Sequence, residues 1–164
     1  MSKQLSEALK EIGYDEVVCV DQRYPSNLVA KIKCKLKWMD GIYRNTYDHI
    51  DAVLNEHGYF DTCLIIKGYG VTPRLVERMK LSCRRVIGYN FDSFSYHPLS
   101  LTWYKCVDKF YTFDFKDAKE RNLEIVELYS AIKNCYEAKE KKYDLSTIQR
   151  VHSDRLLFLD KVLK

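Results

Sequence analysis

The sequence predicts an α/β fold with a doubly wound, mainly parallel sheet, arranged in three layers as α/β/α. Short apolar runs alternate with helical patterns along the chain, and only a few residues connect each run to the next pattern. This alternation is typical of parallel sheets, because a helix carries the chain back between two strands of the same direction. With 46% hydrophobic residues in a chain of 164, one sizeable core can form.

The first third of the chain is predicted to form a helix, a buried strand and a long helical region. Ser2–Ile12 has the pattern of a short amphipathic helix, which Gly13 ends. Glu16–Val20 is continuous and rich in β-branched residues, as expected of a strand that is buried on both faces. Asn27–Asn55 has helical periodicity, and Gly41 is expected to divide it into two helices.

The middle of the chain is predicted to contribute two further strands with a helix between them. Thr62–Lys67 is the second apolar run, and Arg85–Phe91 is the third. Thr72 is a suitable N-cap for the intervening helix, and Pro73 suits its first position. This helix is expected to run to about Ser82.

Five shorter elements are expected after the third strand, and Asn122 is expected to end the last helix among them. In order, they are a loop over Ser95–Ser100, a short helix around Leu101–Val107, a strand over Phe110–Phe113, a helix over Phe115–Arg121 and a strand over Leu123–Leu128.

The remainder of the chain differs in character. Ile132–Lys142 is charged and poor in large apolar residues, so it is interpreted as a linker or an exposed helix. A strand over Tyr143–Ile148 and a helix over Ser153–Lys164 follow. We therefore divide the chain into a domain of residues 1–131, a linker of residues 132–142 and a strand–helix unit of residues 143–164. That unit cannot cover its own apolar faces, so it either packs on the first sheet or begins a second domain.

Composition restricts the partners and the compartment. The formal net charge is only +4, and no nucleic-acid-binding motif is present, which argues against a nucleic-acid partner. Lys31–Lys37 is interpreted as a solvated helix face, with contact to an anionic membrane surface as the alternative. No apolar run approaches the roughly 20 residues that span a bilayer.

The cysteines indicate a reducing compartment and no metal. None of them forms a CxxC motif or a Cys/His pair at zinc spacing. The chain opens with a polar helix rather than a signal peptide, so the cytoplasm is the expected location, with the inner face of the membrane as the alternative. The six cysteines are Cys19, Cys34, Cys63, Cys83, Cys106 and Cys135.

Two predicted strands end on acidic residues. Asp92 and Ser93 follow the third strand, and Asp114 follows the fourth. In an open parallel sheet, ligands bind outside the carboxyl ends of the strands, so these residues are the first candidates for a site. Each also has a structural interpretation. Asp92 and Ser93 suit a turn, and Asp114 suits the N-cap of the next helix.

Other polar residues are expected at the same rim. Lys67 ends the second strand, where it could meet a phosphate or simply be solvated. Gly68 and Gly70 follow it and suit a backbone with positive φ, although a lone GxG is weak support for phosphate binding. His97, in the loop after the third strand, is the histidine best placed to reach the rim.

Four segments, in this order, resemble a family of bacterial GT-B-type glycosyltransferases that make surface polysaccharides or decorate spore coats. They are LIIKGYGVTPRLVERMK, RRVIGYNFDS, VDKFYTFDFKDAKERNLEIVELY and KYDLSTIQRVHSDR. The resemblance runs from about Val17 to the C-terminus and mostly covers the acceptor-side domain. It implies two Rossmann-like domains that face a cleft, with transfer of a sugar from a nucleotide-sugar donor to a glycan acceptor. It implies neither a metal nor a further cofactor.

The resemblance also implies roles for residues. Asp92 would be the catalytic base or would orient the acceptor, and the loop from Lys67 to Pro73 would form one side of the cleft. The loop from His152 to Arg155 would open the donor-side domain. The expected substrate-binding residues are Ser93, Lys67, Gly68, His97 and Asp114, and Ser153 and Arg155 are expected to bind the donor phosphates.

The chain departs from the family in three ways. It begins at the first helix, where the family has a preceding strand; Gln149 stands where the family usually has glycine; and most of a donor-side domain is absent after Lys164. The chain is therefore expected to be the acceptor-side half of a transferase and to be inactive alone. The alternative is a non-catalytic Rossmann-like module that pairs with itself or with a companion chain.

Overall fold

The computed structural model of the chain describes residues 2–20, 32, 40–127 and 161. The chain divides into two compact units, residues 1–129 and 130–164, and every element named below belongs to the first. These elements are α1 (Ser2–Glu11), α3 (Asp40–His57), β1 (Cys63–Ile66), α4 (Pro73–Ser82), β2 (Val86–Asn90), the 3-10 helix η1 (Pro98–Thr102), β3 (Lys109–Thr112), α5 (Phe115–Arg121) and β4 (Glu124–Ile125).

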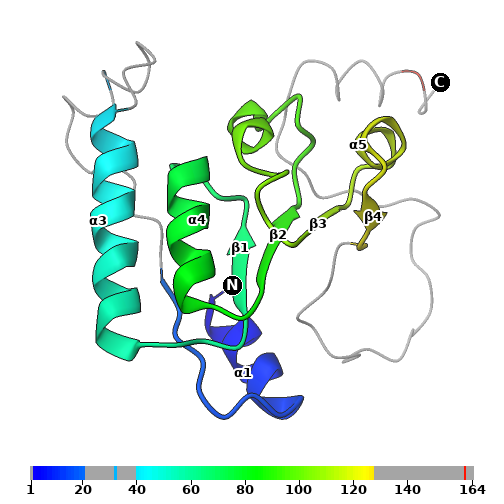
Figure 1. Cartoon of the computed structure of the whole chain (residues 1–164). Coiled ribbons are helices and arrows are strands. Elements are labelled where there is room, and N and C mark those ends of the chain that lie inside the picture. The colour runs from blue at the N-terminus through cyan, green and yellow to red at the C-terminus, as the bar shows by residue number, and fades with distance from the viewer. Residues whose placement is uncertain (1, 21–31, 33–39, 128–160, 162–164) are drawn as a thin grey trace. The chain divides into compact units, whose positions relative to one another are not determined.

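The described strands form an all-parallel sheet in the order β1-β2-β3-β4, which confirms the predicted α/β fold (Figure 1). A helix or a helical turn follows each of the first three strands before the next begins, as in Rossmann-like folds. Ile65 pairs with Gly88, and Gly88 pairs with Phe110. Since every strand points the same way, the carboxyl ends of all four lie along one rim.

One face of the sheet carries the hydrophobic core. Ile65, Val86 and Phe110 are buried there, together with Leu75 of α4 and with Trp103, which has no exposed surface. Gly88 has no side chain because none fits: a Cβ at this position would lie 2.5 Å from the ring of Phe110 and 3.0 Å from that of Trp103.

The other face is more open. Successive residues of a strand point to opposite faces, so this face carries Leu64, Ile66, Ile87 and Tyr111. Leu64 is 41% exposed, and the other three are half-buried, whereas Tyr89, which the register also places on this face, is only 7% exposed. A second helical layer over this face stays a prediction.

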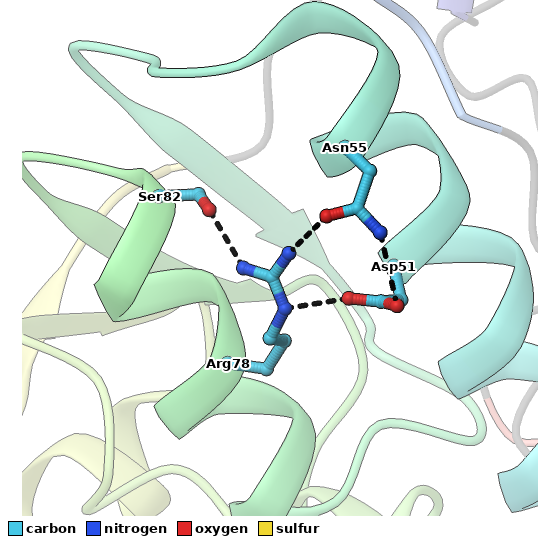
Figure 2. A network of polar contacts seen from close by, with 4 residues as sticks. All are labelled: Asp51, Asn55, Arg78 and Ser82. Atoms are coloured by element: carbon cyan, nitrogen blue, oxygen red, sulfur yellow. Dashed lines mark hydrogen bonds and ion pairs between the residues drawn. The ribbon is translucent and has the colours of Figure 1, made fainter.

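A polar network joins α3 to α4, which lie side by side in Figure 1. Figure 2 shows Arg78 of α4 reaching two side chains of α3. The guanidinium donates to Asp51 at 2.5 Å, to Asn55 at 2.7 Å and to Ser82 of its own helix at 2.6 Å. Asn55 also donates to Asp51 at 3.2 Å. One half-buried arginine therefore holds the two helices in register.

Several predicted helix ends are confirmed by their caps. Thr72 is the N-cap of α4 and accepts the N–H of Leu75 at 3.3 Å, with Pro73 at the first helical position. α5 matches its predicted range, and Asn122 ends it in the left-handed conformation with φ 53°. Gly13, with φ 104°, follows the end of α1.

Other expectations were wrong. Glu16–Val20 is not a strand: the structure gives these residues no regular secondary structure. Their β-branched composition favours a strand only where a neighbouring strand pairs with it. The short helix expected around Leu101–Val107 begins earlier, as η1, because Pro98 suits a first helical position.

Some expectations lie largely outside the described residues, including the helical region before Asp40 and the elements after residue 127. Gly41 lies within the first turn of α3 rather than ahead of it.

Candidate functional site

The carboxyl ends of β1 and β2 bring together several residues that the sequence predicts for a site. Lys67 and Gly68 follow β1, and Asp92 comes two residues after the end of β2. His97, in the loop after β2, makes a hydrogen bond with the main chain of Lys67. We call Lys67, Gly68, Asp92 and His97 the rim site.

An ion pair lies at the centre of the rim site. The Nζ of Lys67 contacts Oδ2 of Asp92, and the side chains are 35% and 34% exposed. The same ammonium lies 5.1 Å from the centre of the Phe91 ring. A partly exposed carboxylate is therefore held in one orientation while it stays within reach of a ligand.

The backbone at Lys67 is strained. Lys67 has φ 66°, a left-handed conformation that is uncommon for a residue with a side chain. The N–H of Lys67 donates to the main-chain carbonyl of Tyr89 at 2.8 Å, and the N–H of Gly68 donates to the carbonyl of Ile66 at 2.8 Å. Such strain costs on the order of 1–3 kcal/mol and is often found at functional sites. Here it turns the chain sharply at the end of β1.

Gly68 permits close packing beneath this turn. It has φ 59°, and a Cβ here would lie 2.2 Å from the Trp103 ring. A side chain at this position would displace the indole and the loop above it. Gly68 therefore shapes the rim site, and its substrate-binding role stays a prediction.

His97 supplies an unusual group to the site. It is only 6% exposed, and its ring lies beside that of Tyr69 with 6.1 Å between centres. Its Nε2 has no hydrogen-bond partner among the described residues. Burial lowers the pKa of His97, the hydrogen bond with Lys67 opposes this, and the Lys67 ammonium lowers the pKa further. The Asp92 carboxylate, in contrast, raises it. The balance favours a neutral imidazole.

The loop between β2 and η1 is fixed by residues that the sequence did not single out. Asn90 donates to Oγ of Ser100 at 2.7 Å, and that hydroxyl donates to the carbonyl of His97 at 2.8 Å. Asp117 of α5 accepts the N–H of Phe94 at 2.6 Å. Asn90 and Ser100 have no exposed surface. These long-range contacts hold Asp92 and His97 in place, and no local sequence signal marks them.

The structure gives two other candidates structural roles. Asp114 is the N-cap of α5, where Oδ1 accepts the N–H of Asp117 at 2.9 Å. The carbonyl of Ser93 accepts the N–H groups of Tyr96 and His97 at 3.0 and 2.9 Å, which makes Ser93 a turn residue. Their substrate-binding roles stay predictions. Ser153 and Arg155 lie outside the described residues.

The described part of the chain contains no group of three or more His, Cys, Asp or Glu side chains arranged to hold a metal ion. No described helix is long and apolar enough to cross a membrane.

Comparison with protein-family models, with curated proteins and with solved structures found no match for the chain. The resemblance to glycosyltransferases therefore depends on the sequence segments alone, and the rim site has to be interpreted from its own geometry.

Proposed function

We propose that this chain is the acceptor-binding half of a GT-B-type glycosyltransferase and that the rim site receives a sugar hydroxyl of the acceptor glycan. One observation carries the proposal. The carboxylate of Asp92 lies at the carboxyl rim of a parallel sheet, partly exposed and held by Lys67. Ligands of open parallel sheets bind at this rim.

The chemistry of the rim site suits a hydroxyl group. A carboxylate can accept the proton of an attacking hydroxyl as a general base, or can orient it by a hydrogen bond. The ion pair with the Lys67 ammonium restricts the rotation of the Asp92 carboxylate. The neutral imidazole of His97 adds a hydrogen-bond acceptor nearby.

Aromatic side chains border the site. Tyr69 is half-buried next to His97, and Phe91 is half-buried next to Lys67. Tyr96, in the loop between β2 and η1, is 86% exposed. Their flat apolar faces can pack against the C–H face of a sugar ring. This surface favours a carbohydrate over a small inorganic anion.

Glycan binding by the full chain tests the proposal. The purified protein is screened against an array of bacterial surface-polysaccharide fragments, and each bound fragment is confirmed by saturation-transfer NMR. Asp92→Asn keeps the size of the side chain and removes its charge, so it should weaken binding by about tenfold or more, the loss expected for a hydrogen bond to a charged group.

Glu120→Gln is the matched control, because Glu120 pairs with Lys116 at 3.8 Å on the exposed surface of α5. It should leave binding unchanged. Failure of the wild-type chain to bind any fragment, or equal binding by Asp92→Asn, would contradict the proposal.

On this proposal the rim site receives the acceptor, and a nucleotide-sugar donor would bind outside it. We therefore expect the isolated chain to release no nucleotide from a panel of nucleotide sugars, as measured by chromatography. Turnover by the chain alone would contradict the division into an acceptor half and a donor half.

One observation favours a second candidate, a non-catalytic module that pairs with itself. β1 contains neither a charged residue nor proline, and among the described residues it forms the edge of the sheet. Natural edge strands usually carry such residues to prevent pairing. Two chains could join β1 to β1 across a twofold axis. Light scattering that gives a monomer at every concentration would exclude this candidate.

A further inference from the structure

Three sulfur atoms meet at the edge of the sheet opposite the rim site. Cys63 begins β1, Met79 lies in α4, and Cys83 is the C-cap of that helix. We call these three residues the sulfur cluster. The amino ends of the parallel strands lie at this edge, so the cluster is independent of the proposed glycan site.

The Cys63 thiol interacts with each of the other two sulfur-bearing side chains. Sγ of Cys63 lies 3.9 Å from Sδ of Met79, and the Cys63 and Cys83 thiols share a hydrogen bond. Met79 and Cys83 are only 3% and 4% exposed, whereas Cys63 is partly exposed.

The main chain fixes the two cysteines. The N–H of Cys63 donates to the main-chain carbonyl of Arg85 at 2.8 Å, and Cys83 forms an isolated parallel β-bridge with Phe60. The N–H of Phe60 donates to the main-chain carbonyl of Ser82 at 2.9 Å. The N–H of Arg84 donates to the main-chain carbonyl of Phe60 at 2.9 Å. The main chain of both residues is therefore held by sheet-type contacts.

The surroundings shift the pKa values of the two thiols in opposite directions. The hydrogen bond from Cys63 lowers the pKa of Cys83, burial opposes this, and the positive charge of Arg78 lowers the pKa further. The same hydrogen bond, followed by burial, raises the pKa of Cys63.

The donor set selects the kind of metal. Zinc is bound by cysteine, histidine and carboxylate, and in the described part of the chain no third ligand of these kinds joins the two cysteines. Thiolate and thioether sulfur together suit Cu(I). If three sulfur atoms surround one ion in a trigonal plane, each at about 2.3 Å from the ion (the length of a zinc–thiolate bond), neighbouring sulfur atoms lie about 4 Å apart. The observed Cys63–Met79 separation of 3.9 Å agrees.

We propose that the sulfur cluster binds one Cu(I) ion through Cys63, Met79 and Cys83. On binding, two copper–thiolate bonds replace two S–H bonds and both protons leave to the solvent, while the copper stays monovalent. Met79 contributes its thioether without losing a proton. The ion and two thiolates carry a net charge of −1, which the nearby Arg78 guanidinium offsets.

A competition titration tests the site. The full chain carries four other cysteines, so the starting protein is the quadruple variant with serine at positions 19, 34, 106 and 135. It is titrated with Cu(I) under anaerobic, reducing conditions in the presence of bicinchoninate, which reports free Cu(I) by colour. We expect one tightly bound ion per chain and a near-ultraviolet absorption from the copper–thiolate bonds.

Met79→Leu is the decisive variant, because leucine fills the same space and the exchange is usually well tolerated. It should weaken Cu(I) binding by about tenfold or more, which is at least the effect of losing a supporting residue at a metal site. Met39→Leu is the control for a methionine elsewhere in the sequence and should leave the affinity unchanged. Thermal unfolding without copper checks that both variants are folded.

Two results would overturn the proposal. In the first, the quadruple variant binds no Cu(I) tightly, which would show that any copper bound by the wild-type chain depends on the four replaced cysteines. In the second, Met79→Leu binds as well as its parent. X-ray absorption of the loaded protein should show three sulfur neighbours, and two alone would remove Met79 from the site.

Discussion

At the scale of single residues, His97 links the candidate site to pH. Burial lowers its pKa from the ordinary value of 6.5, so the folded chain takes up a proton only at lower pH than the unfolded chain. Below about pH 6.5 the unfolded state binds more protons, and the folded state loses stability as the pH falls further. The stabilising effect of the neutral imidazole is therefore fully present above that pH.

Urea unfolding between about pH 8 and about pH 5 measures this effect. The free energy of unfolding should fall more steeply for the wild type than for His97→Gln, which does not titrate. The difference in slope for one group cannot exceed about 1.4 kcal/mol per pH unit. Parallel pH profiles for the two proteins would show that His97 titrates normally in the folded chain.

Gly88 tests the tight packing between the sheet and Trp103. Gly88→Ala would place a Cβ 2.5 Å from Phe110, so it should lower the free energy of unfolding by about 1–3 kcal/mol, as overpacking does. Gly41→Ala is the matched control, because a Cβ in α3 at this position would meet nothing within 4 Å. It should raise stability by about 0.4–1 kcal/mol. Equal effects in urea unfolding would contradict the packing described for Gly88.

At the scale of elements, Arg78 is the main polar link between α3 and α4. Arg78→Met keeps much of the aliphatic stem but loses the bonds to Asp51, Asn55 and Ser82. The free energy of unfolding should fall by about 1.5–3 kcal/mol, since hydrogen bonds to charged groups contribute this much. Lys116→Met, on the exposed surface of α5, should change it by less than about 0.5 kcal/mol. Comparable losses for both variants would show that the link is unimportant.

The elements that the sequence predicted correctly are those whose signals are local. Thr72 and Pro73 mark the start of α4, and Asp114 and Asn122 bound α5, because capping depends on neighbouring residues alone. Glu16–Val20 has an equally strong local pattern but is not a strand. Strand formation depends on a partner far along the chain, and the sequence does not reveal whether that partner is in place.

The same distinction holds for the candidate site. A polar residue at the end of an apolar run can be recognised locally, so Lys67 and Asp92 were predicted, and the parallel topology brings them together. The contacts of Asn90 with Ser100 and of Asp117 with Phe94 join residues at least ten positions apart. Such contacts follow from the fold and could not be predicted before it was known.

At the scale of the whole molecule, the edge at β1 determines how the sheet can grow. The N–H of Cys63, at the start of β1, donates to the carbonyl of Arg85 at 2.8 Å, and the N–H of Lys67, just after β1, donates to the carbonyl of Tyr89 in β2 at 2.8 Å. Leu64, between them, directs its N–H to the opposite side, where the described residues place no strand. Its 41% exposed side chain adds apolar surface next to this edge.

Hydrogen exchange followed by NMR can distinguish a free edge from a covered one. In a dilute sample, the amide of Leu64 should exchange much faster than those of Cys63 and Lys67, because exchange from a free edge needs no opening of the sheet. If a second chain pairs with β1, the protection of Leu64 should rise with protein concentration. Strong protection at every concentration would instead show that another segment of the same chain covers this edge. Glu16–Val20, which is rich in β-branched residues and has no regular secondary structure, is the best candidate.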